Sequence, residues 1–315
     1  MIRKVVVIGG GVLGSQIAYQ SAFKGFDVTV WLRSEASVER AKPKFERLHG
    51  IYLNTLDQMN TPEGKSPFAF ARGLWADAKT YTADVAAELK AKADAAYEHM
   101  IYETDLAKAL ADADLVIESM AEDPKQKIEF YEKAAPLMPA KTILVTNSST
   151  MLPSTFAKYT GREPKYLALH FANSIWKNNT AEIMGHPGTD PEAYQQVVAF
   201  ASAIGMVPLQ LHKEQPGYIL NSMLVPFLEA AEKLVAKEVA DPATVDLTWQ
   251  LGTGAPVGPF RILDIVGLTT AYNIVCMKPD AQVEGTDANK VMLMLKKYID
   301  AGKLGVIAGE GFYKY

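Results

Sequence analysis

The sequence predicts an α/β fold, a wound parallel sheet followed by a smaller all-helical domain. Short apolar runs rich in β-branched residues alternate with helical patterns as far as Leu211, which is typical of βαβ units. Beyond Pro216 helical periodicity dominates to the end, broken by glycine and proline over residues 252–258. We therefore expect a first domain over residues 1–212 and a second over residues 213–315.

The composition is that of a globular protein. The 315 residues are 49% hydrophobic, with a net charge of −4, which argues against nucleic acid or an anionic membrane as the main partner. No segment approaches the roughly 18 consecutive apolar residues of a membrane span. The single cysteine, Cys276, excludes an internal disulfide framework and lies in an apolar run, so we expect it to be buried and inert. The apolar stretch before the first glycines is too short for a signal peptide, so we expect a cytoplasmic protein. The sequence also contains no cluster of metal-ligand residues, so we expect no metal site.

The first 34 residues contain a complete dinucleotide-binding pattern. It consists of a strand over residues 4–8, a G-x-G-x-x-G motif at Gly9, Gly11 and Gly14, a helix over residues 15–24 and a strand over residues 27–32. In a Rossmann-type unit the glycines permit a tight turn, a close approach of backbone to pyrophosphate, and close packing of helix on strand. The expected contacts at the helix start, where free N–H groups favour phosphate, are Gly9, Gly11, Val12, Leu13 and Gly14.

The end of the second strand bears on the choice between NAD and NADP. An acidic residue commonly stands there and binds the adenosine ribose. This sequence instead has Leu32, Arg33 and Ser34, with no carboxylate before Glu35. A guanidinium and a hydroxyl bind a 2′-phosphate that a carboxylate would repel, so these residues favour NADP over NAD. In the alternative, Arg33 is a solvated surface charge and NAD binds without its usual acid.

The remaining elements follow in order. Residues 36–112 are mostly helical in pattern, with a turn over residues 60–64 and a mixed-charge helix over residues 84–100 that we expect to be an exposed arm. The further strands are expected over residues 114–118, 142–146, 166–170, 181–184 and 206–211, and the further helices over residues 124–137 and 191–205.

Two polar residues stand where strands of this sheet end, and open α/β sheets bind their ligands at the carboxyl ends of strands. Ser149 follows one strand and His170 closes another. Glu182 lies in a short apolar strand, where a charge is costly unless it has a partner. An imidazole is the obvious candidate for that partner.

Several stretches together identify a family resemblance. They are residues 5–18, 116–127, 147–149, 170–173 with Glu182, 217–221, 258–268 and 309–315. Here the chain resembles the short-chain L-3-hydroxyacyl-CoA dehydrogenases, including 3-hydroxybutyryl-CoA dehydrogenases, over nearly its whole length except roughly residues 42–102. Several motifs in the right order are far more specific than any one of them.

The resemblance implies a catalytic set. By it His170 is the general acid/base and Glu182 its partner, and a neutral imidazole oriented by a carboxylate suits proton transfer near pH 7. Ser149 and Asn221 would hold the substrate oxygen. The positions that would complete the cofactor site are Glu122, Lys127, Asn147 and Asn173.

Each of these residues also has a structural interpretation. His170 alone would be an ordinary structural histidine at a strand end. Ser149 could cap the helix that begins near Pro153. Asn221 could be an ordinary polar residue early in a helix, and Lys127 could lie on a solvated helix surface.

The leading hypothesis is an NAD(P)-dependent dehydrogenase of short-chain 3-hydroxyacyl-CoA. The family's usual His-Phe-Phe-Asn-Pro is here His-Phe-Ala-Asn-Ser over residues 170–174, and a polar stretch over residues 175–180 replaces an apolar one. The family's CoA-contacting serine and lysine have no match in residues 42–102. A second hypothesis is therefore a dehydrogenase of a free 3-hydroxy acid, as in carnitine and gulonate dehydrogenases. A third is a non-catalytic nucleotide-binding protein.

The resemblance also implies a homodimer formed through the helical domain. The spacing of Leu220, Leu224 and Leu228 gives an apolar face that a partner could share. Core packing within one chain explains that spacing equally well.

Overall fold

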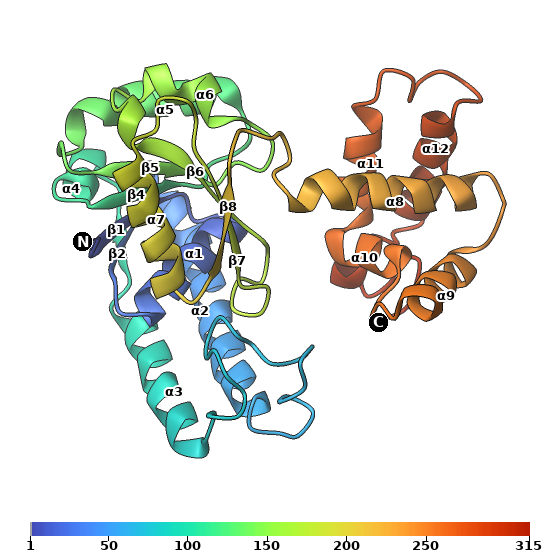
Figure 1. Cartoon of the computed structure of the whole chain (residues 1–315), viewed down its shortest axis with the longest axis horizontal. Helices are drawn as coiled ribbons and strands as arrows, with labels where there is room; N and C mark the ends of the chain where they lie inside the picture. The colour runs from blue at the N-terminus through green and yellow to red at the C-terminus, as the bar shows by residue number, and fades with distance from the viewer. Residues whose placement is uncertain (1) are drawn as a thin grey trace. The chain divides into compact units, whose positions relative to one another are not determined.

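The computed structural model describes residues 2–315 and divides the chain into two compact units, Met1–Ile219 and Leu220–Tyr315. The first is an α/β unit and the second is all-helical, so the predicted fold class is confirmed (Figure 1). The division falls a few residues beyond the change of pattern near Pro216. Each unit is described by itself.

The first unit is built on one eight-stranded sheet with the strand order β3-β2-β1-β4-β5-β6-β7-β8. The strands are β1 (Lys4–Ile8), β2 (Asp27–Trp31), β3 (Ile101–Glu103), β4 (Leu115–Glu118), β5 (Ile143–Thr146), β6 (Tyr166–Phe171), β7 (Thr180–Met184) and β8 (Val207–Leu211). All neighbours pair in parallel except β6 and β7, which are antiparallel and place His170 directly opposite Glu182. The order reverses at β1, where the chain crosses from β3 to β4, and ligands of such sheets bind at that switch.

Helices cover both faces of the sheet (Figure 1). They are α1 (Val12–Phe23), α2 (Glu35–Gln58), α3 (Ala83–Glu98), α4 (Leu106–Leu110), α5 (Pro124–Ala134), α6 (Pro153–Phe156) and α7 (Pro191–Ala203). Alternate strand residues face opposite ways, so Val5 and Val7 join the core of α1, α2, α3 and α7, whereas Val6 and Ile8 join that of α4, α5 and α6. Burial on both faces explains why these strands are continuous apolar runs.

Two expectations for residues 36–112 were wrong. The edge strand β3 was not predicted, because three residues are too few to show a period. The helix expected as an exposed arm is α3, which packs against α1 and α2 and buries Ala86, Leu89, Ala93 and Ala96. Alanine is common on solvated and buried helix faces alike, so a stripe made mainly of alanine gave no clear signal.

The second unit packs five helices around its own core. They are α8 (Leu220–Ala236), α9 (Pro242–Thr253), α10 (Pro259–Val266), α11 (Leu268–Cys276) and α12 (Asp287–Asp300). Leu228 is buried in this core and Leu224 packs against it, so core packing accounts for that part of the leucine spacing. Cys276 is only half-buried, not fully buried as expected. Over residues 2–315, no helix combines the length and apolarity that crossing a bilayer requires.

Candidate active site

The glycine-rich loop between β1 and α1 has the shape that a dinucleotide needs. Gly9 adopts a φ of +105°, and a Cβ there would lie 2.7 Å from the carbonyl oxygen of Ser119. A Cβ on Gly14 would lie 2.3 Å from the carbonyl oxygen of Gly9, so strand and helix touch through backbone. A Cβ on Gly11 meets no described atom within 4 Å. Gly11 is also the N-cap of α1, so the N–H groups of the first turn, at Val12 and Leu13, receive no side-chain cap. These residues fit a pyrophosphate.

The residues expected at the adenosine end have different surroundings. Leu32 is buried in the core, where a Cβ on Gly10 would meet its methyl group at 3.1 Å. Arg33 is exposed. Ser34 is the N-cap of α2, and its hydroxyl accepts a hydrogen bond from the backbone N–H of Ser37. Of the three, Leu32 packs in the core and Ser34 caps α2, whereas Arg33 has an exposed side chain.

Three predicted catalytic residues lie in one hydrogen-bonded chain. His170 Nδ1 is 2.9 Å from Glu182 Oε2, and His170 Nε2 is 3.2 Å from Ser149 Oγ. His170 and Glu182 are buried, and Ser149 is half-buried. An ionised carboxylate only accepts, so Nδ1 carries the proton and donates to Glu182, and Nε2 accepts from the Ser149 hydroxyl. The interpretation of Ser149 as a helix cap is wrong, because α6 begins after Leu152.

Two neighbours complete the surroundings of the imidazole, and the sequence did not reveal their roles. The ring of Tyr218 stacks on His170 with centroids 4.4 Å apart, and its hydroxyl donates to the carbonyl oxygen of Ser148 at 2.7 Å. Burial raises the pKa of Tyr218, so the phenol stays neutral. The backbone N–H of Ile219 donates to Glu182 Oε1 at 2.8 Å. The motif at residues 217–221 marked this segment, but sequence alone could not show which side chain covers the histidine.

Lys127 is not on a solvated surface, so that interpretation was wrong. It is 1% exposed, and its ammonium donates to Glu118 at 2.7 and 2.8 Å. Glu118 also accepts from the hydroxyls of Tyr131 and Thr146 and from the backbone N–H of Met120. The ion pair is buried beneath the carboxyl ends of β4 and β5, where these donors satisfy the carboxylate.

Glu122 and Asn147 hold the backbone around the catalytic chain. Glu122 accepts from the Ser148 hydroxyl at 2.8 Å and from the backbone N–H of Ser149 at 2.6 Å. The Asn147 side-chain oxygen accepts from the backbone N–H of Phe171, the residue that follows His170. Glu122 therefore binds the loop after β5 to the segment after β4, and Asn147 binds the same loop to β6.

The other two predicted residues lie on other elements of the structure. Asn173 is exposed in the connection between β6 and β7, and its carbonyl oxygen accepts from the Asn178 side chain. Asn221 is the second residue of α8, in the helical unit. Its interpretation as an early helical residue agrees with that position, and its role at the substrate stays a prediction.

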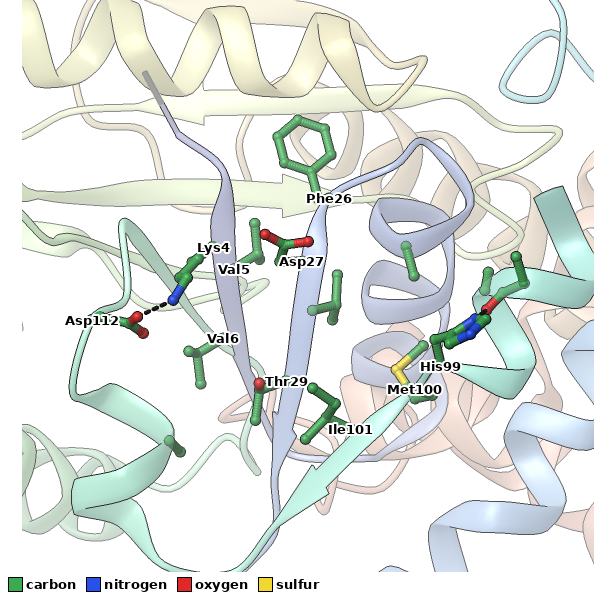
Figure 2. A pocket seen from close by; sticks show the side chains of 15 residues that line it. Lys4, Val5, Val6, Phe26, Asp27, Thr29, His99, Met100, Ile101 and Asp112 are labelled. Carbon is green, nitrogen blue, oxygen red and sulfur yellow. Dashed lines mark hydrogen bonds and ion pairs between the residues drawn. The ribbon is translucent and has the colours of Figure 1, made fainter.

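A pocket also lies at the opposite end of the sheet from Ser149, His170 and Glu182, and these three residues do not line it. That pocket, of about 410 Å³, lies at the amino-terminal ends of β1 and β2 and is lined by Lys4, Asp27 and His99 (Figure 2). Lys4 pairs there with Asp112. Over residues 2–315, no group of three or more His, Cys, Asp or Glu is placed to hold a metal ion.

Comparison with known proteins covers both units. The model of the 3-hydroxyacyl-CoA dehydrogenase NAD binding domain matches residues 4–215, and that of the 3-hydroxyacyl-CoA dehydrogenase C-terminal domain matches residues 217–315. The chain belongs to the 3-hydroxyacyl-CoA dehydrogenase family. It is thus a member of a family of oxidoreductases that use NAD, and the predicted resemblance is confirmed.

Individual members of the family align over the full chain. Human mitochondrial hydroxyacyl-coenzyme A dehydrogenase is 29% identical over 100% of this chain and 92% of its own length. A probable 3-hydroxybutyryl-CoA dehydrogenase of Deinococcus radiodurans is 28% identical over 99% of this chain and 100% of its own. A solved diketoreductase, described as a substrate-directed dual catalyst of dicarbonyl compounds, is 50% identical with a TM-score of 0.82 and covers 100% of this chain and 99% of its own. The chain is therefore similar to a reductase of dicarbonyl compounds as well as to 3-hydroxyacyl-CoA dehydrogenases.

Proposed function

We propose that Ser149, His170 and Glu182 catalyse the interconversion of a 3-hydroxy carbonyl compound and the corresponding 3-oxo carbonyl compound. The observation that carries the proposal is the 2.9 Å contact between His170 Nδ1 and Glu182, with Nε2 directed to Ser149. A bound nicotinamide supplies hydride to the ketone carbon or accepts it from the carbinol. The protein's own residues must then handle one proton and the charge on one oxygen.

The imidazole moves the proton. In the oxidation direction, neutral His170 takes the hydroxyl proton at Nε2 as the carbinol loses its hydride. Glu182 fixes the tautomer by accepting from Nδ1–H and stabilises the imidazolium that forms. In the reduction direction, the imidazolium returns the proton to the new alkoxide. Tyr218 excludes water from one ring face, which strengthens the interaction between imidazolium and carboxylate.

Ser149 and Asn221 are proposed to hold the substrate oxygen. Ser149 already donates toward His170 Nε2, so its hydroxyl can turn to an oxygen that binds beside that nitrogen. Asn221 is proposed as the second donor to that oxygen. The cofactor residues proposed beside them are those of the glycine loop together with Glu122, Lys127, Asn147 and Asn173.

Two substrate classes share the β-dicarbonyl unit. The family favours a short 3-oxoacyl-CoA, as in acetoacetyl-CoA. The 50% identical diketoreductase favours a free dicarbonyl compound, and so does the polar stretch over residues 175–180. We propose that both present the same ketone to His170 and that they differ in what the rest of the pocket binds.

The assay that tests the proposal uses the full chain with NADH or NADPH. Reduction of acetoacetyl-CoA and of ethyl 3-oxobutanoate is followed by the loss of nicotinamide absorbance. Turnover of either supports the β-ketone chemistry, and the ratio of the two kcat/KM values assigns the substrate class. No turnover of either substrate with either cofactor rejects the proposal.

For the cofactor we propose NADP, because Arg33 is exposed just after β2 and no carboxylate occupies residues 32–34, where an acidic residue commonly binds the ribose. Fluorescence titration with NADPH and NADH tests this preference. We expect Arg33→Ala to weaken NADPH binding about tenfold and NADH binding little, the size of one charge-assisted contact. Equal weakening of NADPH and NADH binding would show that Arg33 does not bind the 2′-phosphate.

We further propose a cytoplasmic homodimer. Met223 on α8 and Leu247 on α9 are exposed apolar residues of the helical unit. Exposed apolar residues of this kind favour an interface with another copy. Sedimentation that shows only monomer at micromolar concentration would contradict the dimer.

A further inference from the structure

The connection between β6 and β7, residues 172–179, joins the strand of His170 to the strand of Glu182. It is a tight turn, in which the backbone N–H groups of Lys177 and Asn178 both donate to the carbonyl oxygen of Ser174 at 2.8 Å. Ser174 has a φ of +60°, a conformation that a residue with a side chain rarely adopts. Such a conformation persists only where the surroundings hold it.

Gln16 of α1 holds the turn at this strained residue. Its side-chain oxygen accepts from the backbone N–H of Ser174 at 2.8 Å and from that of Ile175 at 3.4 Å. Gln16 is 6% exposed, and Ile175 is fully buried. Gln16 comes two residues after Gly14, so the helix that starts at the nucleotide loop also grips the turn beside the catalytic strands.

A second support comes from residues 59–82, the segment between α2 and α3. Gly73 in this segment donates its backbone N–H to the carbonyl oxygen of Trp176 at 3.0 Å. A Cβ on Gly73 would lie 2.8 Å from the carbonyl oxygens of both Ile175 and Trp176, so the two backbones are in direct contact. Gln20, one helical turn after Gln16, donates to the carbonyl oxygen of Gly73 at 2.9 Å.

We propose that Gln16 is a positioning residue that sets substrate selectivity by fixing the 172–179 turn, with Gly73 as the second support. The proposal rests on the proposed function, because the turn connects the strand that carries the base to the strand that carries its carboxylate. Its exposed residues are polar: Asn173, Lys177 and Asn178. A polar turn held in one shape suits a short β-dicarbonyl compound whose second carbonyl oxygen needs a hydrogen-bond donor. This also gives the segment between α2 and α3 a task, since it supports the turn from outside the site.

The test compares full-length Gln16→Met, which keeps the side-chain length and loses the acceptor, with Gln16→Glu, which keeps an acceptor. Gln58→Met is the matched control, because Gln58 is exposed on α2. We expect Gln16→Met to raise KM for ethyl 3-oxobutanoate about tenfold, with kcat and the Kd for NADPH changed less than about threefold, because a misplaced turn weakens positioning of the substrate. Gln16→Glu should restore most of the KM, and the control should match the wild type.

Hydrogen exchange supplies a readout that does not depend on activity. The peptide covering residues 172–179 should exchange faster in Gln16→Met than in the wild type or the control. Unchanged exchange and unchanged KM would overturn the proposal, as would an equal loss of cofactor binding. If the wild type turns over neither β-ketone substrate, the proposed function fails, whereas the exchange experiment still decides whether Gln16 fixes the turn.

Gly73→Ala approaches the same turn from its other side. The added Cβ must push on the backbone of residues 175–176, so we expect the same KM increase and the same faster exchange. Arg72→Ala, an exposed neighbour, is its control. A Gly73→Ala protein with wild-type KM and exchange would remove the segment between α2 and α3 from the proposal.

Discussion

Two regions of the molecule bury a glutamate, and they do so in opposite ways. In the α/β unit, Glu118 is fully buried and accepts hydrogen bonds from Lys127, Tyr131, Thr146 and Met120. In the helical unit, Glu232 on α8 is 3% exposed, and within the described residues its Oε1 has no hydrogen-bond partner. The first carboxylate is surrounded by donors, whereas the second is not.

The difference lies in what compensates a buried carboxyl group for its lost hydration. Lys127 and three further donors compensate Glu118 for its lost hydration. Burial raises the pKa of Glu232 to about 7, with a smaller contribution from Glu229, and the nearby Lys278 only partly opposes this. Lys278 is itself paired with Glu229 at 2.7 Å. Glu232 therefore keeps its proton to a higher pH than an exposed glutamate does.

Substitution of Glu182, a third buried glutamate, should have the largest effect, which is on kcat. Glu182 accepts hydrogen bonds from His170 and from the backbone N–H of Ile219. We expect Glu182→Gln to lower kcat by about 10² to 10⁴, because an amide neither stabilises the imidazolium nor enforces its tautomer. Steady-state kinetics measure the loss, and circular dichroism checks the fold. Glu46→Gln, exposed on α2, is the control, and equal activity of the two variants would contradict the role of Glu182.

Removing the partner of Glu118 should give the next largest effect. Lys127→Met leaves a buried charge unpaired, so we expect the free energy of unfolding to fall by about 3–5 kcal/mol. Urea unfolding measures the change, and Lys125→Met, exposed on the same helix, is the control. The double variant Glu118→Gln/Lys127→Met should recover part of the loss. If Lys127→Met were as mild as the control, Glu118 would not depend on its ion pair.

The third effect concerns Glu232 and depends on pH. Between the ordinary pKa of 4.5 and the folded value of about 7, the folded state binds more protons than the unfolded state. Stability from this group is therefore complete below pH 4.5 and is lost as pH rises through 7, by roughly 3 kcal/mol in total. Glu232→Gln should remove this dependence, so its stability relative to the wild type should improve from about pH 4 to about pH 8.

Unfolding in urea, followed by circular dichroism across that pH range, measures the Glu232 effect. Glu284→Gln, an exposed acid of the same unit, should keep the pH dependence of the wild type. A Glu232→Gln protein whose stability follows pH in parallel with the wild type would show that Glu232 ionises freely when folded.

The sequence predicted the parts of the site that depend on local pattern. The glycine loop, the strand that precedes Ser149, the strand that carries His170, and the need of Glu182 for an imidazole partner all follow from residues close in the chain or from the family's motifs. Gln16 and Tyr218 could not be found in this way, because their contacts are distant in the sequence. Gln16 binds the backbone of Ser174, more than 150 residues further along the chain, and Tyr218 binds that of Ser148 in the loop after β5. Lys127 was ambiguous for the same reason, since its partner lies on a different element.

The antiparallel pairing of β6 with β7 has one more consequence. His170 and Glu182 are direct cross-strand neighbours, so the strand ladder fixes the distance between them whatever the length of the connection. A slip of one residue would turn Glu182 to the opposite face of the sheet and is therefore resisted by the whole buried strand. A change in the length of the connection would therefore leave the pair intact, and the turn could change in sequence while the two strands keep the same proton-transfer geometry.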